Sequence, residues 1–139
     1  MKAIEDAQRL LAAGADKVSI NSAAVNDPEL VENMATRFGA QCTVVAIDAK
    51  GNDDGETWRV VTRSGTRDET LTVCDWAKAV TERGAGEILL TSFDRDGTRS
   101  GYDLRLMDAV TQATRLPVIA SGGADSVQHM IEALSLIHI

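Results

Sequence analysis

Short apolar runs alternate along the chain with longer segments in which apolar residues recur at every third or fourth position. The apolar runs at residues 17–21, 43–47, 87–91 and 118–120 have the length and composition of buried strands. The periodic segments at residues 4–12, 29–38, 71–83, 104–113 and 126–134 predict amphipathic helices. Because strand and helix alternate with short connections, the pattern predicts an α/β fold with four parallel strands, flanking helices and right-handed crossovers.

One longer connection interrupts this alternation between the second predicted strand and the helix at residues 71–83. Residues 49–55 are rich in Gly, Asn and Asp and are predicted to form a loop. Residues 57–63 alternate like an exposed strand, and residues 64–66 have the composition of a turn. The connection therefore predicts a small β-hairpin insertion.

The helix starts carry capping signals. Asp27 followed by Pro28 predicts an N-cap and a first helical position, Asp103 is predicted to cap the helix at 104–113, and Asp125 lies near the start of the last helix. Residues 21–24 are predicted to form a polar turn after the first strand. These signals place a polar loop after each strand and a helix after each loop.

Most of the candidate chemistry follows the strand at residues 87–91. Asp96 and Gly97 form a predicted tight turn that brings bare backbone N–H groups to a ligand. Asp48 lies at the predicted carboxyl end of the strand at 43–47, on the same edge of the sheet as Asp96. An aspartate in this place commonly only caps a turn, but two such carboxylates favour shared acid and base roles over one site.

Two glycine-containing motifs have alternative interpretations. Residues 121–123, Ser-Gly-Gly before a helix, have the form of a phosphate cradle, but such a pair equally suits close packing. Residues 94–97 match the start of a calcium loop. Arg99 and Arg105, however, stand where that loop needs glycine and a bidentate glutamate, so we expect no metal site.

Composition narrows the function classes. The 139 residues suffice for one domain, and a net charge of −7 without clustered Lys and Arg argues against a nucleic-acid partner while leaving a small phosphate ligand open. No stretch has the pattern of a membrane span or signal peptide, so a cytoplasmic protein is expected. Cys42 and Cys74 match no zinc motif and are predicted to be buried, reduced thiols; a nucleophilic Cys-His pair is the alternative.

Four segments together resemble one enzyme family. The segments GADKVSIN (14–21), VVAIDAK (44–50), RGAGEILLTS-DRDGT-SGYD (83–103) and LPVIASGGA (116–124) are similar to the cyclase subunit of imidazole glycerol phosphate synthase, of histidine biosynthesis. The resemblance implies a (β/α)8 barrel, of which residues 1–134 would supply the part from the third helix to the seventh. Residues 135–139 depart from the family pattern and are expected to be a non-native tail.

The resemblance also implies an activity and a partner. The family cyclase uses ammonia from a glutaminase subunit to close and cleave a bisphosphorylated ribulosyl formimino carboxamide nucleotide, a lyase reaction for which we expect no cofactor. By resemblance Asp48 is one catalytic aspartate, Asn21 and Ser22 hold one phosphate, and Asp96, Gly97 and Gly123 hold the other; Gly122 is added to the second site as part of the predicted phosphate cradle. The resemblance also implies that Ser64, Thr91 and Ser121 line the site and that Lys17 and Glu87 belong to a charged ring where ammonia enters.

Two alternatives remain beside the cyclase. The first is the sister sugar isomerase of the same pathway, which shares the barrel, the phosphate pockets and the strand-end aspartates. The second is that the chain is an inactive phosphate-binding fragment. The second catalytic aspartate of the family lies on the first barrel strand, which these residues do not match. We therefore expect the 139-residue chain to be inactive alone.

Overall fold

The structure, a computed structural model, describes residues 3–62 and 71–137. The helices in these ranges are α1 (Ile4–Ala12), α2 (Ser22–Asn26), α3 (Glu29–Phe38), α4 (Val73–Glu82), α5 (Leu104–Ala113) and α6 (Val127–Ile137), with a 3₁₀ turn η1 (Ala40–Cys42). The strands are β1 (Val18–Ile20), β2 (Thr43–Gly51), β3 (Trp58–Val61), β4 (Glu87–Ser92) and β5 (Val118–Ser121).

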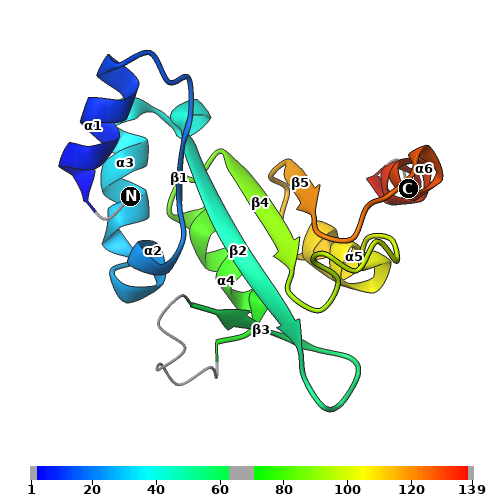
Figure 1. The fold of residues 1–139 in the computed structure, drawn as a ribbon. Helices are drawn as coiled ribbons and strands as arrows, with labels where there is room; N and C mark the ends of the chain where they lie inside the picture. The colour runs from blue at the N-terminus through cyan, green and yellow to red at the C-terminus, as the bar shows by residue number, and fades with distance from the viewer. Residues whose placement is uncertain (1–2, 63–70, 138–139) are drawn as a thin grey trace.

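Four of these strands form a parallel sheet in the order β1-β2-β4-β5, as Figure 1 shows. The sequential order, each strand followed by a helix, confirms the predicted α/β fold with its parallel sheet and flanking helices. Such an arrangement is that of consecutive units of a (β/α)8 barrel. All four carboxyl ends therefore lie along one edge of the sheet.

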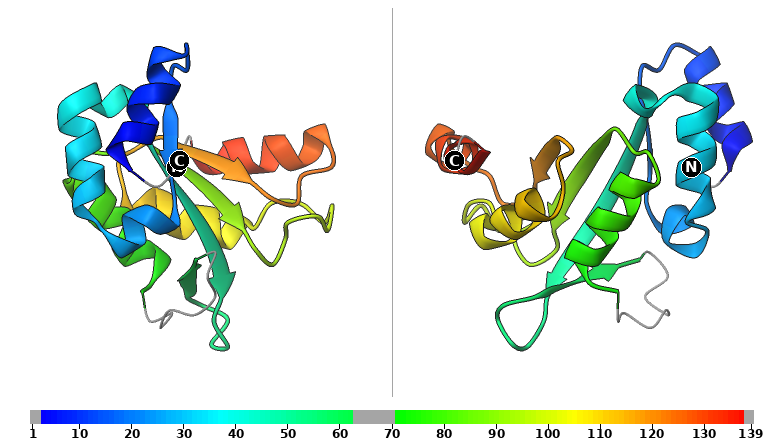
Figure 2. Two further views of the ribbon diagram at one scale, coloured as in Figure 1. Left: turned by 60° about the vertical axis from the view of Figure 1, so that its left-hand side comes forward. Right: turned by 180° about the vertical axis from the view of Figure 1, so that it is seen from behind.

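The helices α4 and α5 cover one face of the sheet, which the view from behind in Figure 2 shows. In β4, Ile88 and Leu90 are buried against this helical layer, whereas Leu89 and Thr91 on the opposite face are half-buried. This alternation follows from the two-residue period of a strand. The fully buried side chains include Ile20, Met34, Ile47, Ile88, Leu90 and Leu106.

The second strand is longer than predicted. β2 continues past Ile47 to Gly51, because its backbone pairs with β4 on one side and antiparallel with β3 on the other, with Asp48 opposite Val61. This long-range pairing overrides the turn-forming composition of residues 49–51. The hairpin insertion is confirmed, but its predicted turn at residues 64–66 lies outside the described residues.

The capping predictions have mixed outcomes. The Asp103 carboxylate accepts the Leu106 N–H at 3.1 Å, as predicted. Asp27 does not cap α3 through its side chain: Pro28 occupies the N-cap position, and the Asp27 carbonyl oxygen accepts the Leu30 N–H at 3.0 Å. A polar turn was expected at residues 21–24, but α2 begins there, because the amides of residues 24 and 25 both bond the carbonyl of residue 21.

The remaining helix boundaries differ modestly from prediction. α4 begins at Val73, where the Thr72 hydroxyl accepts the Asp75 N–H at 3.2 Å. α6 runs through Ile137, beyond the predicted boundary at residue 134, and Ser126 rather than Asp125 supplies its cap by accepting the His129 N–H at 3.2 Å. A hydroxyl at the N-cap position is a favoured partner for these unpaired amides.

Candidate active site at the carboxyl end of the sheet

Three of the predicted site residues form one row across the sheet. Asp48 of β2 is in register with Thr91 of β4, and Thr91 is in register with Ser121 of β5. Residues in register on neighbouring strands project to the same face. All three are half-buried and lie on the face opposite the helices, near the carboxyl end of the sheet. Asp48 was predicted to lie at the end of its strand. Because β2 extends to Gly51, Asp48 instead lies inside the strand.

Asn21 brings the end of β1 to this row. Its side-chain Nδ2 donates a hydrogen bond of 2.9 Å to Asp48 Oδ2. Its Oδ1 is buried and has no hydrogen-bond partner within the described ranges. A buried acceptor without a partner is costly unless something supplies a donor, so this oxygen is available to a ligand N–H or O–H. Ser22, the first residue of α2, follows directly.

The loop after β4 and the turn after β5 are held together by backbone contacts. The Gly101 N–H donates to the Gly123 carbonyl oxygen at 2.7 Å. A Cβ at Gly123 would lie 2.1 Å from the Gly101 oxygen, and a Cβ at Gly122 would lie 3.0 Å from the Ser92 oxygen. Both glycines also have positive φ values, 94° and 96°. Close packing, one of the two interpretations left open, is therefore a sufficient reason for this glycine pair.

These contacts bring Asp96 and Gly97 next to the glycine pair. A Cβ added at Gly122 would lie 3.5 Å from the Cα of Asp96. Gly97 has a φ of 75°, and nothing lies within 4 Å of its Cβ position. Asp96 itself is exposed. No hydrogen bond or ion pair among the described residues joins Asp96 to Asp48, so a shared acid and base role for these two carboxylates stays a prediction.

The opposite, amino end of the sheet carries the predicted charged pair. Lys17, directly before β1, forms an ion pair with Glu87, the first residue of β4, and thus reaches across β2. The two side chains are 50% and 20% exposed, so water screens the attraction only in part. The structure therefore brings together the two residues expected where ammonia enters. Ser64, expected to line the site, lies outside the described residues.

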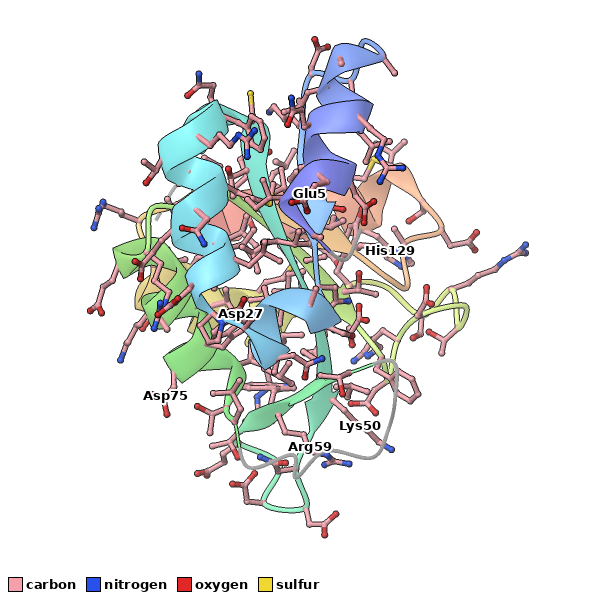
Figure 3. All side chains as sticks on the ribbon, turned by 90° about the vertical axis from the view of Figure 1, so that its left-hand side faces the viewer. Glu5, Asp27, Lys50, Arg59, Asp75 and His129 are labelled. Atoms are coloured by element: carbon pink, nitrogen blue, oxygen red, sulfur yellow. The ribbon has the colours of Figure 1, made fainter. Side chains whose placement is uncertain are left out.

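The β2–β3 hairpin adds side chains that the sequence analysis missed. Lys50 follows Asp48 by two positions, on the same strand face, and its Nζ lies 5.3 Å from the centre of the exposed Phe93 ring. The Gly51 N–H donates to Asp94 Oδ2 at 2.8 Å. Figure 3 shows Lys50 beside Arg59 of β3. The two-residue period, applied from Asp48, would have indicated Lys50.

The cysteines lie away from this site. Cys42 and Cys74 are free and half-buried, so the expectation of full burial was wrong for both. In residues 3–62 and 71–137, no group of three His, Cys, Asp or Glu side chains is placed to hold a metal ion. None of the helices in the same ranges is long and apolar enough to cross a membrane.

The fold is that of a segment of an α/β barrel with a row of polar residues near the carboxyl ends of its strands, and comparison with known proteins defines the class. The family model described as histidine biosynthesis protein matches residues 1–138, and the chain belongs to that family. The resemblance inferred from the four sequence segments is thereby confirmed.

The most informative relatives are three proteins named imidazole glycerol phosphate synthase subunit HisF. The protein from Caulobacter vibrioides (strain NA1000 / CB15N) is 56% identical over 133 residues, which are 96% of this chain and 51% of the relative. The proteins from Hydrogenobaculum sp. (strain Y04AAS1) and Lactococcus lactis subsp. cremoris (strain SK11) are 53% and 52% identical, over 98% and 95% of this chain and 54% and 51% of their own length. The chain thus spans about half the length of the curated relatives it matches.

Proposed function

We propose that this chain is part of the cyclase subunit of imidazole glycerol phosphate synthase, a lyase of histidine biosynthesis. The observation that carries the proposal is that Asp48 accepts a hydrogen bond from Asn21 and is in register with Thr91, which is in turn in register with Ser121. The chain that holds this row of residues is 56% identical to a subunit of that synthase. The names of the relatives favour the cyclase over the sister isomerase. The substrate is the bisphosphorylated ribulosyl formimino carboxamide nucleotide, with ammonia as the second reactant.

Asp48 acts as the general acid and base in this proposal. The Asn21 amide fixes the orientation of the carboxylate by donating to Oδ2, and Thr91 and Ser121 place hydroxyls along the same row. A positioned acid or base typically contributes roughly 10²- to 10⁴-fold to a rate. Asp48 is therefore the residue of this chain on which turnover should depend most.

The two phosphate sites lie on either side of Asp48. Asn21 and Ser22 follow β1, whereas Asp96, Gly97, Gly122 and Gly123 follow β4 and β5. Neighbouring strands are about 4.8 Å apart, so the three intervals from β1 to β5 span about 14 Å. A substrate with a phosphate near each end fits this span and places its centre between β2 and β4, beside Asp48 and Thr91. Positive-φ glycines at the second site expose backbone N–H groups to an anion.

The partner in this proposal is a glutaminase subunit that delivers ammonia at the amino end of the sheet. The Lys17–Glu87 ion pair supports this assignment, because it places polar groups at the end opposite Asp48. The enzyme would work in the cytoplasm, where the pathway's phosphorylated intermediates are retained.

The test is Asp48→Asn in the complete subunit. The substitution keeps the size and removes the titrating group, so kcat should fall by roughly 10²-fold or more with a small change in substrate affinity. The assay is ammonia-dependent loss of the bisphosphate substrate. The matched control is Asp53→Asn, an exposed acid of the hairpin loop, which should leave the rate unchanged.

A second assay separates the alternatives, with the substrate of the sister isomerase in place of the cyclase substrate. Conversion of that substrate without ammonia would favour the isomerase. Full activity of the Asp48→Asn subunit would contradict the cyclase assignment of this residue. A polypeptide of these 139 residues alone should show no turnover, because these residues form only part of the site that orients the substrate.

A further inference from the structure

His129 lies in the first turn of α6 and turns its ring back toward the residues that precede the helix. The imidazole Nδ1 accepts the Asp125 N–H at 3.1 Å, while the His129 N–H donates to Ser126 Oγ at 3.2 Å. This arrangement resembles a capping box, except that the imidazole accepts from the N–H of Asp125, one residue before the capping Ser126. Because Nδ1 accepts, the neutral ring carries its proton on Nε2.

The other edge of the imidazole ring faces Gly101. A Cβ added at Gly101 would lie 3.4 Å from His129 Cδ2 and 3.5 Å from Nε2, so the ring lies beside this glycine with space for a methyl group between them. Gly101 is the residue whose N–H bonds the Gly123 oxygen at 2.7 Å. The His129 side chain thus hydrogen-bonds the turn after β5 and lies beside the loop after β4.

We propose that His129 is a positioning residue that, while its imidazole is neutral, holds the turn after β5 against the loop after β4 and so fixes the anion-binding backbone of Gly97, Gly122 and Gly123. The proposal rests on the proposed function only for the identity of the anion, a substrate phosphate. Protonation removes the acceptor, because an imidazolium has two N–H donors and no lone pair. An N–H on Nδ1 would then face the N–H of Asp125, and the hydrogen bond would be lost.

Several residues with charged side chains line the same cleft as His129, which has a volume of about 290 Å³ and lies between α5 and α6. Arg95, Asp103 and Arg105 come from the loop after β4 and from α5, and Glu132 comes from α6 itself. Asp125 lies in the turn before α6. Figure 3 places His129 apart from the Lys50 and Arg59 side chains of the hairpin. With two cations and three carboxylates around the ring, neither sign of charge dominates, and the hydrogen bond to Asp125 is the contact that protonation changes.

The test compares the wild-type chain with His129→Asn and His129→Ala, using inorganic sulfate as the probe. Sulfate remains a dianion at both pH 8 and pH 5, so the charge of the probe is the same in the two measurements. The measurement is the titration of the Gly97 and Gly123 amide resonances. Wild-type affinity should fall roughly two- to tenfold from pH 8 to pH 5, as expected for one lost hydrogen bond. His129→Asn should be nearly independent of pH, because its amide oxygen accepts without titrating, and His129→Ala should be weak at both values.

Two outcomes would overturn the proposal. One is a pH response of His129→Asn equal to that of the wild type. The other is tighter sulfate binding at pH 5, which would mean that the positive charge of the ring outweighs its positioning role. Met130→Ala, an exposed neighbour on α6, is the control and should behave as the wild type does.

A second readout separates this proposal from the proposed function. Exchange of the Gly101 amide hydrogen at pH 8 reports the bond to Gly123 without any ligand, and it should be faster in His129→Ala than in the wild type or His129→Asn. Unchanged exchange would show that His129 positions nothing. Faster exchange with no sulfate binding in the wild type would refute the phosphate pocket and leave the positioning role standing.

Discussion

Cys74 lies half-buried on α4, with its Sγ 3.8 Å from the Ala109 carbonyl oxygen of α5. Burial raises the pKa of this thiol above its ordinary value; nearby Lys78 lowers the pKa and Asp75 raises it, both by less than burial does. The thiolate is therefore less favoured in the folded chain than in the unfolded chain. It is the thiolate that reacts with alkylating agents.

We expect Cys74 to react more slowly with iodoacetamide in the native chain than in urea at pH 8.5. The raised pKa also makes the free energy of unfolding depend on pH. Stability is unaffected below the ordinary thiol pKa of about 8.5 and falls as the pH rises toward the raised pKa of the folded state. Mass spectrometry measures the first effect, and urea midpoints between pH 7.5 and 9.5 measure the second. The Cys74→Ala chain should lose the alkaline slope; equal slopes would show that the thiol does not cause it.

At the same scale, the family resemblance supplied candidate site residues but not the contacts between them. Asp48 and Asn21 were both predicted, yet their hydrogen bond joins residues 27 positions apart. The Lys17–Glu87 ion pair joins residues 70 positions apart. Such contacts depend on which strands become neighbours, and periodicity within one segment contains no such information. Lys50 was missed because its strand was predicted to end before it.

At the scale of elements, the contact between the two glycine-containing loops should be sensitive to a single methyl group. Gly123→Ala places a Cβ 2.1 Å from the Gly101 carbonyl oxygen, at a positive φ. Gly14 has a similar φ of 110°, but nothing lies within 4 Å of its Cβ position, so Gly14→Ala is the matched control.

Both substitutions should cost about 1–2 kcal/mol for the left-handed backbone, and Gly123→Ala should cost roughly 1–3 kcal/mol more for the clash. The free energy of unfolding from urea melts measures the difference. Equal losses at the two positions would mean that the loops separate at no cost, and that the close approach does not stabilise the fold.

Local signals had mixed success even where donor and acceptor are close in sequence, since the cap predicted at Asp27 was wrong. The Asp103 cap was correct because its side chain bonds the amide only three residues ahead. The end of β2 was wrong because Asp48, Ala49 and their neighbours are held in extended conformation by pairing with β3 and β4. Composition favoured a loop there, and hydrogen bonds to two other strands decided otherwise.

At the scale of the whole molecule, the strand order agrees with the (β/α)8 barrel that the resemblance implies. Each strand–helix unit returns the chain to the same edge of the sheet, so consecutive parallel strands become neighbours unless a crossover skips one. The observed order β1-β2-β4-β5 is that simplest outcome, with β3 added only by the hairpin. What alternation did not show is which outer surfaces stay apolar after the helices have packed.

One such surface is the exposed face of α6. Val127, Met130, Ile131 and Leu134 recur at helical spacing and are 51–71% exposed. Ile119 of β5, in register with Leu89, is 46% exposed on the sheet face opposite the helices. β5 also ends the strand order within the described residues, so one of its edges has no strand partner there. An exposed apolar stripe and an open strand edge both favour association.

We therefore expect a polypeptide of these 139 residues to self-associate as its concentration rises. Ile131→Lys with Leu134→Lys should weaken association, because each places a charge in the apolar stripe while replacing a side chain that is already 53% exposed. Leu10→Lys, on α1 at 46% exposure, is the matched control outside the stripe. Sedimentation velocity over a hundredfold concentration range would measure the effect. If the wild type sediments as a monomer throughout, the stripe does not drive association; if Leu10→Lys weakens association as much as the double substitution, the contact lies elsewhere.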